Sequence, residues 1–343
     1  MSIKITGATA AGAGQIARIV RYVIAVHNAL LLRDPTVSEI DQYANSVFTG
    51  GSPMDIFDQV NASEERQSQA VLFVVPGHYY SPIANPKELA EHVSRLPEAG
   101  PELPGIALDR AALVATWDDL LPYMMSCPFP LKRADGYRFF FDNNFFGIGD
   151  GLILHALLRK YRPKRYVEIG CGFSSACALD TIDGYLPGAC QATFVEPHPE
   201  RLRAAIGERG SVRVLDVPVQ TVGLELFAEL EAGDILFIDS SHVLRTGSDV
   251  AFELFEILPR LAPGVLVHFH DISWPFEYPV PWIMEENRSW NEAYALRALL
   301  TSNDDWKILV FNDYFSKFEA ARVTQAFPAF HGELGASLWL ERR

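Results

Sequence analysis

The second half of the chain alternates between short apolar runs and stretches whose apolar residues recur at helical spacing. Helical patterns near 152–161, 174–183, 224–231, 248–260 and 290–300 fill the gaps between predicted strands at 165–169, 193–196, 212–215, 234–239, 265–270, 306–311 and 336–340. Strands that alternate with helices form parallel sheets covered on both faces. We therefore predict an α/β fold with a Rossmann-like, doubly wound, seven-stranded sheet. Because no clear helix separates the last two strands, the last strand is expected to be antiparallel.

The first part of the chain has a helical pattern instead. A stripe of apolar residues runs from Ile16 to Leu31, and Thr36 with Glu39 has the spacing of a capping box that starts the next helix. A further helix is expected through Ile56 and Val60. We predict a helical N-terminal module at 1–66, a linker or cap region at 67–136 and the main domain at 137–343. The stretch 33–65 resembles a small helical module related to phycobilisome linkers, although a generic helical hairpin would have the same pattern.

Composition and charge exclude several classes of protein. The 343 residues are 49% hydrophobic and carry 29 basic against 43 acidic side chains, a net charge of −14. Nucleic acids and anionic membranes attract basic surfaces, so neither is an expected partner. The four cysteines form no CxxC pair, and no run approaches the roughly 20 apolar residues of a membrane helix. Without a signal-peptide pattern, the expected location is the cytoplasm, with reduced thiols.

A glycine turn after the first predicted strand is the most informative motif. Glycines in a strand–turn–helix allow the backbone to approach a ligand at the carboxyl edge of the sheet. A dinucleotide fingerprint would place glycine at 175, where this chain has serine. The other template has an acid two residues before the first glycine, where Glu168 could bind an ammonium group. The cofactor-binding candidates here are Glu168, Gly170, Cys171, Gly172 and Ser174.

Two further acids follow the next strands. Glu196 ends the second strand, where a carboxylate can accept hydrogen bonds from ribose hydroxyls, although it could also cap a helix that begins after it. Asp216 follows the third strand and is placed for an adenine ring. Nicotinamide and S-adenosylmethionine (SAM) sites share these features, so the acids alone leave the cofactor open.

The ordered motifs resemble those of a known family. The turn 168–172, Glu196, the segment 233–242 and the closing strand are similar to class I SAM-dependent methyltransferases, above all to bacterial small-molecule and sugar O-methyltransferases of the family-24 type. The resemblance covers about 137–343. It implies a seven-stranded sheet with an antiparallel last strand, SAM as cofactor, and methyl transfer to a hydroxyl of a small molecule such as a sugar or glycoconjugate. Ser174 departs from the family, many members of which have a third glycine.

Two other functions remain open at this stage. An NAD(P)-dependent oxidoreductase shares the first half of the fold, but the chain lacks the third glycine and a clear Tyr-x-x-x-Lys pair. A noncatalytic SAM-binding assembly subunit is the second alternative. Three polar residues at the ends of neighbouring strands argue mildly against it.

Asp239, His270 and Asp271 are expected to project from neighbouring strand ends. They resemble the divalent-cation site of metal-dependent O-methyltransferases, in which the ion activates the acceptor hydroxyl. Histidine in the middle position suits Mn, Fe or Zn at least as well as Mg. Without a metal, His270 or His242 could act as general base. Asp239 is also a candidate for cofactor binding, because it is expected near the sulfonium of the donor. Alternatively, His270 is a core histidine and His242 caps a helix.

Aromatic residues in two loops are candidates for contact with the acceptor or for closing the site. They are Tyr79, Tyr80, Trp274, Tyr278 and Trp282. Their rings could form an apolar wall over a small-molecule acceptor. Such loops could equally stabilise a homodimer.

Overall fold

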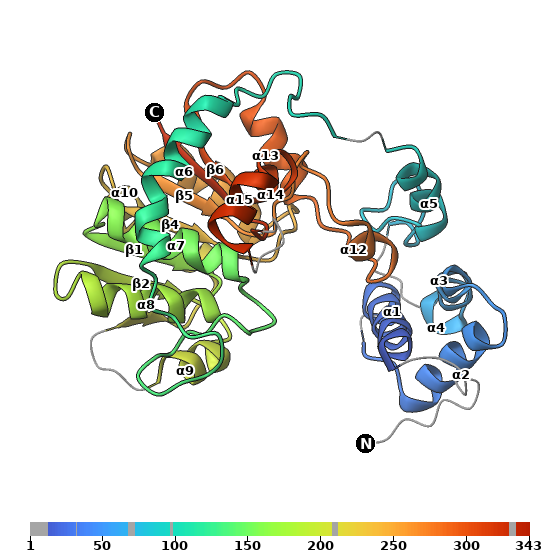
Figure 1. The fold of residues 1–343 in the computed structure, drawn as a ribbon. Coiled ribbons are helices and arrows are strands. Elements are labelled where there is room, and N and C mark those ends of the chain that lie inside the picture. The colour runs from blue at the N-terminus through green and yellow to red at the C-terminus, as the bar shows by residue number, and fades with distance from the viewer. Residues whose placement is uncertain (1–12, 32, 68–72, 97–98, 208–211, 329–333) are drawn as a thin grey trace. The chain divides into compact units, whose positions relative to one another are not determined.

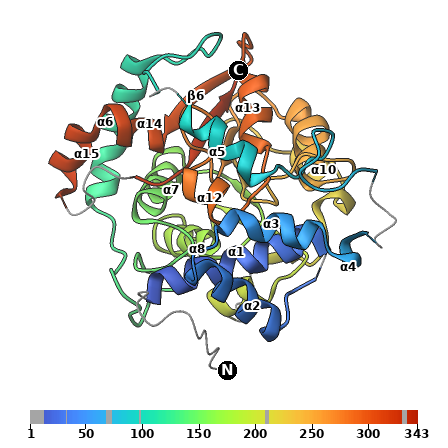
Figure 2. The ribbon, with the colours of Figure 1, turned by 90° about the vertical axis from the view of Figure 1, so that its right-hand side faces the viewer.

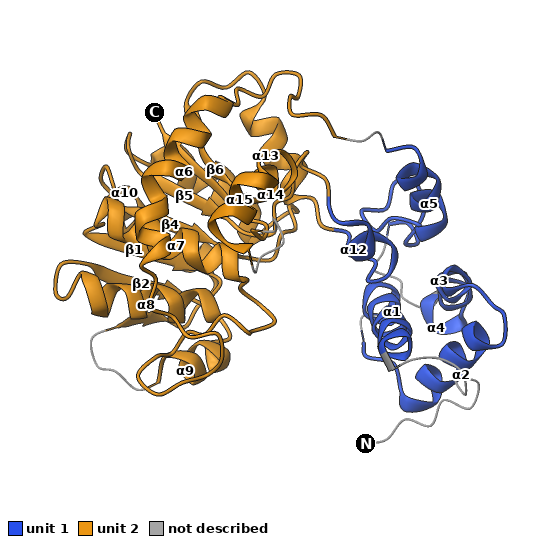
Figure 3. Cartoon of the chain, in the orientation of Figure 1, with its two compact units in different colours: residues 1–98, 278–289 blue, residues 99–277, 290–343 orange. Residues whose placement is uncertain are grey.

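In the computed structural model, which describes residues 13–31, 33–67, 73–96, 99–207, 212–328 and 334–343, the chain divides into two units (Figure 3). The N-terminal unit comprises residues 1–98 and 278–289, and the sheet unit comprises residues 99–277 and 290–343. These boundaries differ from the predicted domains. Residues 99–136 belong with the sheet, and residues 278–289 belong with the N-terminal helices.

A seven-stranded sheet organises the sheet unit (Figure 1). Its strands are β1 (Arg165–Ile169), β2 (Gln191–Val195), β3 (Arg213–Leu215), β4 (Ile235–Ile238), β5 (Leu266–Phe269), β6 (Trp306–Phe311) and β7 (Leu338–Arg342). The order is β3-β2-β1-β4-β5-β7-β6, with β7 antiparallel to both of its neighbours. The central strands β4 and β5 are buried along their whole length, as expected when helices cover both faces of a sheet. The predicted Rossmann-like architecture is confirmed.

Helices flank this sheet on both sides. They are α6 (Arg110–Met125), α7 (Ile148–Tyr161), α8 (Phe173–Tyr185), α9 (Glu200–Ile206), α10 (Glu225–Ala228), α11 (Asp249–Phe252), α13 (Glu292–Leu300), α14 (Asn312–Phe318) and α15 (Ala320–Ala326). Figure 2 shows α6, α14 and α15 to one side of β6, and α10 and α13 to the other. The expectation that no helix separates the last two strands was wrong, because α14 and α15 lie between β6 and β7. Both are only seven residues long, too short to give a clear periodic stripe.

The N-terminal unit is helical, as the sequence pattern predicts. Its helices are α1 (Ala13–Leu31), α2 (Val37–Phe48), α3 (Pro53–Asn61), α4 (Glu64–Gln67), α5 (Pro86–Ser94) and α12 (Val280–Met284). The apolar stripe of α1 packs against α2 and α3 in a buried core. The capping box is present: the Thr36 side chain accepts a hydrogen bond from the Glu39 N–H, and Glu39 Oε2 accepts one from the Thr36 N–H at 2.7 Å. None of the described helices combines the length and apolar character needed to cross a bilayer.

Candidate functional site

The turn after β1 brings its backbone against the end of β4. Gly170 has φ +76°, and a Cβ built there would lie 1.8 Å from the carbonyl oxygen of Asp239. No side chain fits in that space, and the positive φ also favours glycine. At Gly172 the nearest atom to such a Cβ is the side-chain Cδ of Arg201, at 3.5 Å. The two glycines therefore differ: only Gly170 is sterically required.

The buried side chain of Glu168 stabilises this turn through hydrogen bonds. Its buried carboxylate accepts hydrogen bonds from the hydroxyls of Tyr166, Ser174 and Ser175, each at 2.7 Å. Burial raises the pKa of Glu168 to about 7, although the three hydroxyl donors favour its ionised form. The hydroxyls enclose the carboxylate, and it does not line the cavities described below. The predicted contact with a ligand ammonium group does not fit this placement.

Replacing Glu168 with glutamine should flatten the pH dependence of stability. The folded-state pKa of about 7 lies above the ordinary 4.5, so the free energy of unfolding should fall as pH rises between these values. The difference corresponds to about 3 kcal/mol. Urea unfolding of the full chain between pH 5 and 8 measures it, with exposed Glu200→Gln as control. Parallel pH profiles for Glu168→Gln and wild type would contradict this expectation.

Two adjoining cavities open around the turn. The first, of about 320 Å³, lies between the ends of β1 and β2, the segment 218–220 and the residues after β4. The second, of about 220 Å³, is bounded by the turn, Arg201 and the residues at the ends of β4 and β5. Both are lined by Gly170, Glu196 and Asp239, so one elongated ligand could extend from the first into the second.

Glu196 connects the turn to the end of β2. Its Oε2 accepts a hydrogen bond from the Cys171 N–H at 3.0 Å, and its Oε1 accepts one from the His198 N–H at 2.8 Å. Asp216 lies elsewhere: it pairs with Arg203 at 3.1 Å, is half exposed, and lines neither of the two cavities. The structure thus places Glu196, but not Asp216, at the predicted cofactor cleft.

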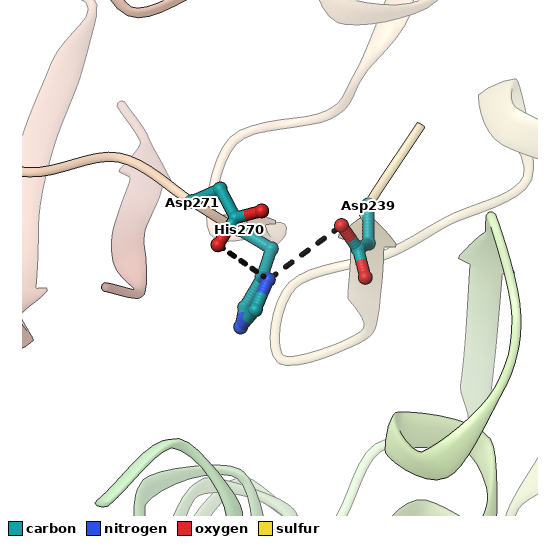
Figure 4. Close-up of side chains that lie close together, drawn as sticks. All are labelled: Asp239, His270 and Asp271. Carbon is teal, nitrogen blue, oxygen red and sulfur yellow. Dashed lines mark ion pairs between the residues drawn. The ribbon is translucent and has the colours of Figure 1, made fainter. Parts of the chain in front are cut away.

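The three predicted metal ligands come together at the strand ends (Figure 4). Asp239 follows β4, and His270 and Asp271 follow β5. The Nδ1 atom of His270 is 3.6 Å from Asp239 Oδ1 and 3.4 Å from Asp271 Oδ1. Ligand atoms of the three residues all lie within 4.8 Å of one another. We call these three residues the strand-end cluster.

His242, the other predicted catalytic histidine, faces the same cluster. Its Nε2 is 3.4 Å from Asp239 Oδ1 and 3.6 Å from Asp271 Oδ2, and its Nδ1 is 2.8 Å from Glu292 Oε2. The backbone is left-handed at both His242 (φ 60°) and Asp271 (φ 58°). Such conformations are costly for residues other than glycine and concentrate at functional sites.

The carboxylates and imidazoles of the strand-end cluster and His242 shift one another's pKa values. Burial opposes ionisation of Asp239, but His270 and His242 hold its pKa well below the ordinary value. Burial likewise opposes protonation of His242, yet Asp239 and Glu292 raise its pKa to about 10. Burial also opposes protonation of His270, whose pKa Asp239 and Asp271 raise well above the ordinary value. The carboxylates thus stabilise the protonated form of both imidazoles, and an ion that binds here would displace those protons.

Sequence reasoning missed two buried acids behind the histidines. Asp150, in α7, has its Oδ2 3.6 Å from His270 Nε2, while its Oδ1 accepts hydrogen bonds from Asn312 and Ser337. Glu292, at the start of α13, bonds His242. An acid within the otherwise apolar pattern of α7 was the available signal for Asp150. A glutamate at a helix start is too common to have indicated Glu292.

The aromatic residues that line the second cavity were not among the predicted ones. Phe145, Phe146 and Phe173 line the second cavity. Trp274 is buried, and its indole N–H donates to the Gly100 carbonyl oxygen at 2.9 Å, so a role as acceptor wall does not fit this placement. The remaining candidates belong to the N-terminal unit, and their contact with acceptor stays a prediction: Tyr79, Tyr80, Tyr278 and Trp282.

Sequence comparisons relate the chain to a known family. Residues 167–272 match the sequence profile of a family described as a methyltransferase domain. A relative from Archaeoglobus fulgidus, described as an uncharacterized protein, is 32% identical over 165 residues, which are 46% of this chain and 73% of the relative.

Solved structures with a similar fold include two methyltransferases. The SAH-bound Podospora anserina methyltransferase PaMTH1 has a TM-score of 0.38 and 17% identity, covering 75% of this chain and 96% of that one. The O-methyltransferase TomG from Streptomyces achromogenes, in complex with SAM, has a TM-score of 0.34 and 15% identity, covering 64% and 86%. With its glycine turn, its sheet topology and the match of residues 167–272 to a methyltransferase domain, the chain belongs to the class I SAM-dependent methyltransferases.

Proposed function

We propose that the protein transfers the methyl group of SAM to a hydroxyl of a small molecule, with sugars and glycoconjugates as the acceptor class, assisted by a divalent cation. One observation carries the proposal: the strand-end cluster borders the second cavity, which adjoins the first through Gly170, Glu196 and Asp239. A donor along the glycine turn and an acceptor at the cluster would therefore meet.

The donor half of the site has the features that SAM requires. Glu196 offers carboxylate oxygens beside the turn, where ribose hydroxyls can donate to them. Gly170 keeps the turn free of a side chain, so that the ligand can lie against the backbone. When bound, SAM supplies an activated methyl group on its sulfonium. The chain's part is to orient that group toward the acceptor.

In the acceptor half of the site, the spacing of the possible ligand atoms suits a bound cation. Ligand atoms that lie about 2.1 Å from one ion, in octahedral or tetrahedral geometry, are about 3.0–3.4 Å apart. The separations of 3.4 and 3.6 Å from His270 Nδ1 to the two aspartates come close to that range. Asp239, His270 and Asp271 would hold the ion, which lowers the pKa of a bound hydroxyl and orients it. Around it, the rings of Phe145, Phe146 and Phe173 would help to exclude water.

The direct test is methyl transfer from labelled SAM to a panel of sugars, glycoconjugates and phenols, with and without a chelator. We expect SAM to bind much more tightly than NAD, and turnover to stop on chelation and return with added metal. Tighter binding of NAD would reject the proposal. Turnover that is indifferent to the chelator would reject the cation.

Replacing Glu196 with alanine should weaken SAM binding without unfolding the protein. The Glu196 carboxylate would accept hydrogen bonds from the ribose hydroxyls of SAM, and it already accepts one from the Cys171 N–H. Hydrogen bonds to a charged acceptor contribute about 1.5–3 kcal/mol, so Kd should rise about 10- to 100-fold. Calorimetry measures Kd, and Glu200→Ala, an exposed change four residues away, is the control. An unchanged affinity would remove Glu196 from the donor site.

A further inference from the structure

We propose that His242 is a fourth ligand of the cation, and that the site consequently selects a transition-metal ion over Mg²⁺. This inference rests on the cation in the proposed function and adds the ligand set and the kind of ion. It starts from the symmetry of the site: two imidazoles face the same two carboxylates. The Nε2 of His242 and the Nδ1 of His270 each lie 3.4–3.6 Å from an oxygen of Asp239 and of Asp271.

These four separations suit a shared ion better than direct bonds. A hydrogen bond from a ring N–H to a carboxylate oxygen is usually about 2.7–3.2 Å long. All four contacts are longer, although the side chains of both histidines are nearly buried. Atoms that share one ion at about 2.1 Å lie about 3.0–3.4 Å apart. The ligand atoms of Asp239, His270 and Asp271 already lie within 4.8 Å of one another, whereas His242 is outside that group and approaches the other oxygen of Asp271, so its imidazole must move toward His270 Nδ1 to become the fourth ligand.

Each imidazole also has an acid on its far side. Glu292 Oε2 lies 2.8 Å from His242 Nδ1, and Asp150 Oδ2 lies 3.6 Å from His270 Nε2. Metal-binding histidines usually donate their second ring N–H to a carboxylate or carbonyl, which fixes the tautomer and orients the ring. Once an ion displaces the proton of Nε2, an N–H on Nδ1 that donates to Glu292 leaves the lone pair of His242 Nε2 directed at the strand-end cluster.

The backbone holds His242 in this place. Its carbonyl oxygen accepts hydrogen bonds from the N–H groups of Asn291 and Glu292, at 3.1 and 3.2 Å. The start of α13 therefore binds both the backbone and the imidazole of His242. These contacts maintain the left-handed backbone conformation of His242.

The donor atoms determine the kind of ion. Mg²⁺ is usually bound by carboxylates, phosphates and water, whereas imidazole suits Mn, Fe, Co, Ni and Zn. Two nitrogen and two carboxylate ligands from one chain would therefore favour a first-row transition metal. Replacing one imidazole should therefore weaken the binding of a transition-metal ion more than it weakens the binding of Mg²⁺.

Titration of chelator-treated protein with Co²⁺, followed by its visible absorption and by calorimetry, tests the ligand set without reference to turnover. Wild type should bind Co²⁺ at least about 100-fold more tightly than Mg²⁺, with absorption bands that report nitrogen ligation. His242→Asn, chosen because asparagine tolerates a left-handed backbone, should weaken Co²⁺ binding at least tenfold and change the bands. Glu292→Gln, which keeps an oxygen for Nδ1 but removes the charge, should weaken it about tenfold.

Exposed His92→Asn is the matched control and should leave both measurements as in wild type. Retained SAM affinity shows that each variant has folded. Co²⁺ binding and bands that are unchanged in both His242→Asn and Glu292→Gln would overturn the inference, as would tighter wild-type binding of Mg²⁺. Neither result touches the proposed methyl transfer, which the labelled-SAM assay measures separately. A failure of wild type to bind any divalent ion would reject the cation altogether.

Discussion

Gly170→Ala is expected to abolish SAM binding and to destabilise the protein by about 2–5 kcal/mol. The new Cβ would lie 1.8 Å from the Asp239 carbonyl oxygen, on a backbone with φ +76°. The left-handed conformation costs about 1–2 kcal/mol for a residue with a Cβ, and forced overpacking costs about 1–3 kcal/mol more. Relief of the clash must separate the turn from the end of β4, which would distort both cavities. Urea unfolding and SAM calorimetry measure the two effects.

Gly172→Ala is the matched control. Its Cβ would approach only a side-chain atom, Cδ of Arg201, at 3.5 Å. We expect a change in stability below about 1 kcal/mol and nearly normal SAM binding. If both substitutions had the same effect, the close approach at Gly170 would not be the constraint on this turn.

Asp239→Asn is expected to reduce kcat/KM at least about 100-fold. Substitutions that affect only the outer partners of a metal ligand typically cost 10- to 100-fold, and Asp239 would contact the ion itself. The change would also leave His242 and His270 with one carboxylate fewer to face. Initial rates with labelled SAM over a range of metal concentrations measure the loss, and extra metal should restore part of it.

Asp216→Asn serves as its control. This acid also follows a strand of the sheet, but it pairs with Arg203 and lines neither cavity. Its turnover should stay close to that of wild type. Turnover of Asp239→Asn within a few-fold of wild type would exclude Asp239 as a ligand of a catalytic ion.

The sheet could be predicted because its strands are short apolar runs bounded by helices. The predicted strand at 165–169 coincides with β1, and that at 306–311 with β6. Once the strands are ordered, the carboxyl edge follows, and with it the meeting of Asp239, His270 and Asp271. The connection between β6 and β7 could not be predicted in this way, since α14 buries Tyr314 and Phe315 without a regular apolar period.

The rest of the site depends on tertiary contacts that leave no local pattern. Asp150 reaches His270 from a helix 120 positions earlier, and Glu292 reaches His242 from 50 positions later. For Trp274, an aromatic and proline-rich segment has the same appearance in sequence whether it lines a cavity or fills a core. In the structure it packs against Phe311 and Tyr314.

The hydrogen bonds that fix Asp150 indicate how the metal preference of this enzyme could be changed. Its Oδ1 accepts hydrogen bonds from Asn312 Nδ2 at 2.8 Å and from Ser337 Oγ at 2.6 Å. These two residues stand at the two ends of the connection between β6 and β7. Substitutions selected in this connection would move the Asp150 carboxylate behind His270 without replacing any of the proposed metal ligands. Variants with altered metal preference should therefore arise at positions remote in sequence from the chemistry they adjust.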